Sequence, residues 1–205
     1  MNFTDLATQE TVSSTIEALG KNGLTAELVQ TKAEAKRKVL SLIPEGAEVM
    51  TMTSISLEET GIEAEINSSK KYKSVKSMLS SMSRDTEGRE MQKLGAAPEW
   101  ALGSVHAVTE NGEVIVTSGT GSQLPAYLYG ASHVIWVVGT QKIVKNVDEA
   151  MERIHKHLIP LESVRARKAY GLPDTWNTTP SKTVIIRSEA PNRIHIIFVN
   201  EKLGF

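Results

Sequence analysis

The chain has 205 residues and a formal net charge of −1, with 23 Lys and Arg against 24 Asp and Glu. This balance argues against a dedicated nucleic-acid-binding protein, which needs a concentrated excess of positive charge. Because there is no cysteine, this chain alone cannot hold an iron–sulfur cluster, a thiolate zinc site or a disulfide. Any redox chemistry is therefore expected to come from a partner or a bound cofactor.

The N-terminal residues, MNFTDLATQE, have neither the basic nor the apolar region of a signal peptide. The longest apolar runs, such as residues 134–138, are too short to cross a membrane. We expect a cytoplasmic protein with no membrane insertion and no nucleic-acid partner. The length predicts a single domain over residues 1–205, in which residues 160–205 complete the fold.

Apolar residues recur at helical or strand spacing through the first third of the chain. The predicted elements are a helix ended by Gly20 and Gly23, a strand over 24–29, a helix ended by Pro44, a strand over 47–52 and a short helix that stops near Gly61. Thr31 and Glu34 form a capping box at the start of the second helix. Ser56 and Glu59 are predicted to form another at the start of the third.

The rest of the chain predicts a polar helical region followed by strands and helices in alternation. The predicted elements are helices around 75–82 and 91–94, a hairpin of 103–109 with 113–117 around Asn111-Gly112, a short helix from Ser122 to Gly130, a strand over 133–138, a helix capped by Asn146 and running to about 158, another from Pro160 to about Tyr170, and strands over 183–187 and 194–199. Together these predict an α/β fold with a mixed, mostly parallel sheet and helices on both faces.

The small residues Ser118, Gly119, Thr120, Gly121 and Ser122 form the leading candidate for a binding site. They follow a predicted strand and open a predicted helix, so their amides can point toward an anion beside the positive end of the helix dipole. The alternative is a tight turn in which Ser122 only caps the helix. The spacing of the glycines fits neither the Walker nor the Rossmann pattern.

Thr53 and Ser54 follow a predicted strand directly. The carboxyl ends of strands line the ligand crevice in open α/β sheets, so both residues are candidates for ligand contact. The alternative is that they cap the next helix, and capping is the preferred role of Ser56.

The five histidines do not form a ligand set, so no metal site is expected. His155 and His157 are two residues apart on a predicted helix and face different directions. His106 and His195 lie in predicted strands among apolar neighbours, as expected for core or edge side chains. His133 begins a buried strand and could reach a crevice or end the sheet. The spacing nominates no pair of nucleophile and base, so the catalytic residues are unknown.

An ordered set of motifs resembles the LUD (lactate-utilisation) domain, in the branch of lactate-utilisation protein C. The motifs are Thr51-Met-Thr-Ser54 with Ser56-Leu-Glu-Glu-Thr-Gly-Ile62, Gly103-Ser-Val-His-Ala-Val-Thr-Glu-Asn-Gly112, Val116-Thr-Ser-Gly-Thr-Gly-Ser122, Pro160-Leu161 with Arg165, and the C-terminal residues 193–205. The resemblance implies a NagB/RpiA/CoA transferase-like fold and a role in oxidising L-lactate to pyruvate beside iron–sulfur partners. It also makes Arg165 a candidate anion ligand, the alternative being a surface charge. Similar chains often carry a cysteine cluster where residues 169–182 here have none, so a metal or redox role for that segment is not carried over.

The leading hypothesis is an accessory protein of lactate oxidation that binds a small anion (lactate, pyruvate or a phosphate) through the residues above and works with iron–sulfur oxidoreductase subunits. No cofactor is expected on this chain, and a homo-oligomer is compatible with this role. One alternative is a standalone transferase or isomerase acting on an acyl-CoA or a sugar phosphate. Another is a ligand-binding module without chemistry.

Overall fold

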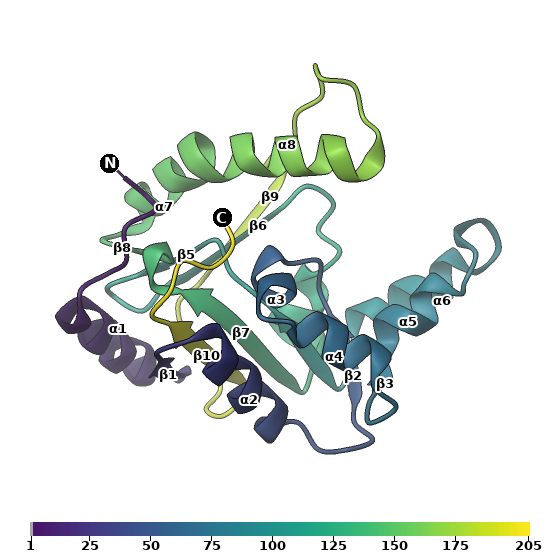
Figure 1. The fold of residues 1–205 in the computed structure, drawn as a ribbon, viewed down its shortest axis with the longest axis horizontal. Coiled ribbons are helices and arrows are strands. Elements are labelled where there is room, and N and C mark those ends of the chain that lie inside the picture. The colour runs from purple at the N-terminus through teal and green to yellow at the C-terminus, as the bar shows by residue number, and fades with distance from the viewer. Residues whose placement is uncertain (1) are drawn as a thin grey trace.

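Two β-sheets stacked between layers of helices make up the computed structural model, which describes residues 2–205 (Figure 1). All strands of the larger sheet are parallel. In spatial order they are β1 (Thr25–Val29), β10 (Ile194–Val199), β7 (His133–Gly139), β4 (Trp100–Gly103), β2 (Glu48–Thr51) and β3 (Lys73–Ser74). The predicted α/β class is confirmed, and the carboxyl ends of the parallel strands meet along one edge of the sheet.

The smaller sheet has four strands of mixed direction. They are β8 (Ile143–Val144), β5 (Ala107–Thr109), β6 (Val114–Ser118) and β9 (Lys182–Ile186). The two last strands of the chain therefore lie in different sheets, since β9 pairs with β6 and β10 lies between β1 and β7.

The predicted hairpin is present as β5 and β6, but its first strand is shorter than expected. The predicted strand over 103–109 is broken at residues 104–106: β4 ends at Gly103 in the large sheet and β5 begins at Ala107 in the small one. At the end of β4, Gly103 leaves room for the side chain of Tyr127, because any Cβ at that position would collide with the Tyr127 hydroxyl. The three residues at the break become free to line a cavity.

Helices cover one face of the large sheet, and the small sheet covers the other. The helices of the first layer are α2 (Lys32–Leu42), α3 (Ile55–Glu59) and α4 (Ile62–Ser68). Strand β7 shows why both faces must be covered, because Ile135 and Val137 pack toward these helices while Trp136 and Val138 pack toward the small sheet. Helix α1 (Gln9–Lys21) borders that second core through Leu19.

A pair of helices extends from the sheets as an arm. Helices α5 (Val75–Ser80) and α6 (Arg84–Ala96) form the arm on the right of Figure 1, where two amphipathic helices were predicted. Among the described residues, no helix has the length and apolar character needed to span a membrane.

Residues 147–170 form one continuous helix instead of the two that were predicted. It consists of α7 (Val147–Arg153), the π-helical turn η3 (Ile154–Leu158) and α8 (Ile159–Tyr170), and it lies along the upper edge of Figure 1. Pro160 cannot donate the amide hydrogen bond that continues an α-helix. The wider π-helical turn just before it absorbs this missing bond, so the helix continues where a break was predicted.

Two of the three predicted helix caps are confirmed. The side chains of Thr31 and Asn146 accept hydrogen bonds from the third following amide, at 3.2 and 3.0 Å. The capping role predicted for Ser56 is wrong, because α3 begins earlier and Ser54 accepts the amide of Leu57. Ser56 is instead a buried residue inside the helix, available for another contact.

Candidate ligand-binding site

A cavity of about 600 Å³ lies between the carboxyl ends of the parallel strands and helix α8. The segments that follow β2, β4 and β7 contribute Thr53, Ser104 and Lys142, and the end of β6 contributes Ser118. This is the edge at which open α/β sheets bind their ligands. The volume falls within the range of small-molecule sites, which is about 300–1,000 Å³.

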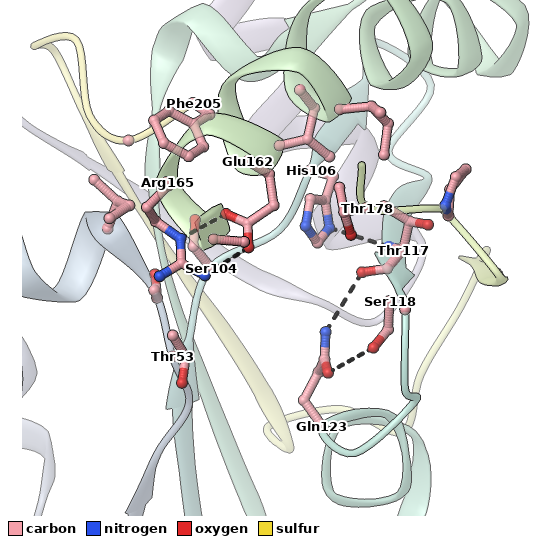
Figure 2. Close-up of a pocket in the computed structure, with 18 of the residues that line it drawn as sticks. Thr53, Ser104, His106, Thr117, Ser118, Gln123, Glu162, Arg165, Thr178 and Phe205 are labelled. Carbon is pink, nitrogen blue, oxygen red and sulfur yellow. Dashed lines mark hydrogen bonds and ion pairs between the residues drawn. The ribbon is translucent and has the colours of Figure 1, made fainter. Parts of the chain in front are cut away.

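Seven of the eight residues nominated from the sequence line this cavity: Thr53, Ser54, Ser118, Gly119, Thr120, Ser122 and Arg165. Figure 2 shows three of them, Thr53, Ser118 and Arg165, around the same space. The exception is Gly121, which lines an adjoining groove. The fold therefore brings together residues that lie more than a hundred positions apart in the sequence.

The glycine loop is stabilised by its own side chains. The amide of Gly121 donates to the hydroxyl of Ser118 at 2.8 Å, and the amide of Ser122 donates to Thr120 at 3.3 Å. The Ser118 hydroxyl in turn donates to Gln123 (Figure 2). Gly121 has a positive φ of 86°, as a tight turn requires.

The helix after this loop is shorter than predicted. It does not begin at Ser122 but at Leu124, and its main part is the π-helical segment η1 (Ala126–Gly130). No side chain caps η1. Since two of the loop amides are already engaged within the loop, contact with a ligand falls mainly to its hydroxyl groups and to the amides nearest β6.

Thr53 and Ser54 have different roles at the end of β2. Ser54 is the N-cap of α3 and accepts the amide of Leu57 at 3.4 Å. Thr53 is exposed, and its hydroxyl points into the space that Figure 2 displays. Of the two residues, Thr53 is the one with a free hydroxyl for a ligand.

Arg165 is already paired across the mouth of the cavity. Its guanidinium donates two hydrogen bonds to Glu162, of 2.7 and 2.6 Å (Figure 2). It also lies over the ring of Tyr170. The Glu162 carboxylate is the main reason why the pKa of Arg165 is raised. Arg165 can contact an anion only by sharing its charge with Glu162.

A lysine that was not nominated from the sequence lies at the floor of the cavity. Lys142 is only 4% exposed, and its Nζ lies 3.2 Å from the hydroxyl of Ser56 and 3.1 Å from that of Ser104. The pKa of Lys142 is lowered from 10.5 to about 7, mainly by burial and also by the nearby Arg153, whereas Glu59 acts in the opposite direction. At neutral pH both the ammonium and the neutral amine are therefore populated.

The C-terminal residues close over this lysine. Gln141 donates to the carbonyl of Leu203 at 2.9 Å, which holds the end of the chain against the turn η2 (Thr140–Lys142). A Cβ on Gly204 would lie 2.6 Å from the Ser56 hydroxyl and 3.3 Å from the Lys142 Nζ. Only glycine allows the backbone to approach the lysine this closely.

His106 lies in the break between β4 and β5, where it lines the cavity. Its Nδ1 accepts a hydrogen bond of 3.0 Å from the amide of Thr117 (Figure 2). In the neutral ring the proton must then be on Nε2, which becomes a hydrogen-bond donor. Burial, reinforced by Lys142 and Arg153, holds the pKa of His106 far below 6.5 and keeps the ring neutral. The prediction that His106 lies within a strand is wrong, because β4 ends at Gly103 and β5 begins at Ala107.

Arg153 adds a second buried cation near Lys142. It is completely buried, and its Nη1 donates to the carbonyl of His106 at 2.7 Å. Its Nε and Nη2 have no partner among residues 2–205. Burial lowers the pKa of Arg153 to about 10, so it remains charged at neutral pH.

Within the described part of the chain, no three acidic or histidine side chains are close enough together to hold a metal ion. The polar groups of the site are instead hydroxyls, amides and basic side chains. Lys142 could have been nominated in the same way as Thr53, because both directly follow a buried parallel strand. No sequence signal indicates Arg153 or Ser56, whose roles depend on burial.

The fold and the cavity define an α/β protein with a cavity of small-ligand size at the carboxyl edge of a parallel sheet. The family model of the LUD domain matches residues 12–199, and the chain belongs to the LUD domain family. Its fold is similar to the crystal structure of a DUF162 family protein from Deinococcus radiodurans, with a TM-score of 0.58 at 15% identity over 96% of this chain and 100% of that chain. No curated protein sequence matches significantly.

Proposed function

We propose that this chain binds a small carboxylate, lactate or pyruvate, in the cavity and takes part in the oxidation of L-lactate with iron–sulfur partner subunits. Membership of the LUD domain family supports the connection with lactate. The observation that carries the choice of ligand is Lys142, a buried amine at the cavity floor without a carboxylate partner. Its ion-pair partner would be the ligand.

The charges around the floor are not balanced within the protein. No carboxylate forms an ion pair with Lys142 or Arg153 among the described residues. Buried charges in proteins are normally paired, because an isolated one loses its hydration without compensation. An anion in the cavity would supply the missing charge.

The walls supply the hydrogen bonds that a hydroxy or oxo acid needs. Thr53, Ser104 and Ser118 contribute hydroxyl groups, and His106 contributes an Nε2 donor. A carboxylate has two oxygens that accept several such bonds. The cavity has ample room for a three-carbon acid beside these groups.

The redox step is assigned to partner subunits. Oxidation of lactate to pyruvate releases two electrons, and this chain has no cysteine with which to hold an iron–sulfur cluster. In this proposal the chain binds the substrate or product while the partner subunits carry the electrons. Co-purification from cells with iron–sulfur subunits is the expected result, and isolation of the tagged chain with no such subunit would contradict it.

Ligand binding can be tested by thermal unfolding of the purified chain. We expect lactate or pyruvate to raise the melting temperature, and the uncharged analogue lactamide to leave it unchanged. The Lys142→Met variant should lose most of this stabilisation, because it lacks the cation. Equal stabilisation of the wild type and Lys142→Met would show that the anion binds elsewhere.

The glycine loop is a second part of the proposed site and has its own test. In Gly121→Val, a β-branched residue would occupy a φ of 86° and its Cβ would lie 2.6 Å from the side chain of Lys182. We expect the loop to move, displacing Ser118 and lowering ligand-dependent stabilisation more than stability itself. Gly46→Val is the matched control, since Gly46 has a φ of 82° in open space far from the cavity. Equal ligand responses in both variants would make the loop only a turn.

A larger ligand is the second candidate, favoured by a groove that adjoins the cavity. The groove shares Met52, Thr53 and Ser122 with the cavity and continues along the arm of α5 and α6. Its walls include apolar side chains and the basic residues Arg84 and Arg89. An acyl-CoA could place its acyl end in the cavity and its pantetheine arm in this groove. Binding of coenzyme A by the purified chain would favour this alternative, and an Arg84→Glu variant should weaken such binding.

A further inference from the structure

The surroundings of Lys142 are unusual for a residue that only attracts an anion. Its Nζ contacts two hydroxyl groups, Ser56 and Ser104, and among the described residues it forms no ion pair with a carboxylate. A lysine whose only task is charge attraction is best kept fully protonated by exposure or by an acidic neighbour. Here burial favours the neutral form of the lysine, and it leaves a reactive amine at the surface of the ligand cavity.

We propose that Lys142 is a nucleophile that forms a covalent imine with the carbonyl carbon of a 2-oxo acid bound in the cavity. This inference rests on the proposed function, because it takes the keto form of the same ligand, pyruvate, as the reacting species. It assigns to the chain a chemical step that distinguishes the product of lactate oxidation from its substrate. Lactate has an alcohol at that carbon and cannot react.

The geometry supplies each part of this reaction. The amine nitrogen adds to the carbonyl carbon, and the electron pair of the C=O bond moves to the oxygen, which takes up a proton. The nitrogen then loses a proton, its lone pair forms the C=N bond, and the oxygen takes up a second proton and leaves as water. Loss of the remaining proton from the nitrogen gives the neutral imine. One amine and one ketone give one imine and one water, with no change of oxidation state. The hydroxyls of Ser56 and Ser104, which lie 3.3 Å apart, can carry protons between nitrogen and oxygen.

The cavity also orients the acid for attack. The ligand carboxylate would lie toward the donors of His106 and the loop after β6, which places the neighbouring carbonyl carbon toward the floor. The close approach of Gly204 limits the movement of the amine on its other side. A short acid held between donors and amine is the arrangement that an amine nucleophile requires.

Reductive trapping tests the proposal directly. The purified chain is incubated with pyruvate and sodium cyanoborohydride near neutral pH, and its intact mass is measured. We expect one reduced pyruvate adduct per chain, which peptide mapping of the wild type locates at Lys142. Lactate with the same reductant should give none. Lys142→Arg, which keeps the charge, should lose the adduct, whereas Lys145→Met, on an exposed neighbouring lysine, should keep it.

A parallel binding measurement separates this inference from the proposed function. If pyruvate stabilises the chain against heat and no adduct is trapped, the imine is excluded while the anion site stands. Adducts scattered over exposed lysines, or an unchanged adduct in Lys142→Arg, would also overturn the assignment. If neither stabilisation nor an adduct is found, both proposals fail.

Discussion

Replacing Lys142 by Met is expected to make the fold more resistant to unfolding at neutral and acidic pH, and this gain should disappear in alkali. Met has a flexible unbranched side chain that can occupy the same space without a charge. The variant no longer buries an amine that lacks a carboxylate partner. Replacement of a typical buried side chain has the opposite effect and lowers stability.

The pH dependence follows from proton binding in the two states. The pKa of Lys142 is about 7 in the folded chain, against 10.5 for an ordinary lysine. Between these values the unfolded chain binds a proton that the folded chain does not, so the stability of the wild type rises with pH over this range. Below pH 7 the whole cost of burial is present. At about 1.4 kcal/mol per unit of pKa, the difference between variant and wild type should change by up to about 5 kcal/mol between acid and alkali.

Urea unfolding at pH 6, 8 and 10 measures this difference, since the free energy of unfolding is obtained at each pH. Arg153 and Glu59, the charged groups that act on Lys142, are retained in both chains. Lys145→Met, at an exposed site, should show no such trend. A difference that does not vary with pH would contradict the lowered pKa.

Replacing Gly204 by Ala should damage both the fold and the site. Gly204 has a positive φ of 63°, and the added Cβ would lie 2.6 Å from the Ser56 hydroxyl and 3.3 Å from the Lys142 Nζ. The backbone conformation alone costs about 1 kcal/mol in a residue with a side chain. The collision must in addition displace the C-terminal residues or the Ser56–Lys142 contact. We expect a loss of roughly 2–4 kcal/mol in the free energy of unfolding, together with weaker stabilisation by pyruvate.

Gly171→Ala is a matched control for the backbone contribution. Gly171 ends α8 with a φ of 62°, nearly that of Gly204, but nothing lies within 4 Å of an added Cβ. Its replacement should cost only the conformational part. The difference between the two variants in the free energy of unfolding, measured by chemical unfolding, therefore gives the cost of the collision at the lysine. Equal losses in the two variants would show that the C-terminus does not press on Lys142.

Local patterns predicted most elements because their causes are local. Thr31 and Asn146 cap helices through their own third following amides, and Asn111-Gly112 closes the turn between β5 and β6. The nearly continuous apolar run at β7 indicated a strand covered on both faces, as the two cores on either side of it confirm. Where distant contacts decided the outcome, the prediction was wrong, as for the strand predicted over 103–109, which is divided between the two sheets.

The meeting of the predicted site residues also follows from a general rule. Thr53 lies just past β2, and parallel strands deliver such residues to one edge of their sheet. Ser118 is the exception, because it ends β6 of the smaller sheet and reaches the cavity through the packing of the two sheets. The rule places residues near a crevice but does not give their hydrogen bonds. The structure shows that part of the glycine loop satisfies its own amides, and that Arg165 is paired with Glu162.

By itself, the sequence determined the α/β class, the family and the edge at which the site lies, because periodicity, caps and strand ends are properties of neighbouring residues. Only the tertiary structure decided the chemistry at the cavity floor. The pKa of the Lys142 amine is lowered because surrounding segments, among them those of Ser56, Ser104 and Gly204, bury it and because Arg153 lies nearby. Burial and missing charge compensation depend on everything packed around a group, and no stretch of sequence contains that information.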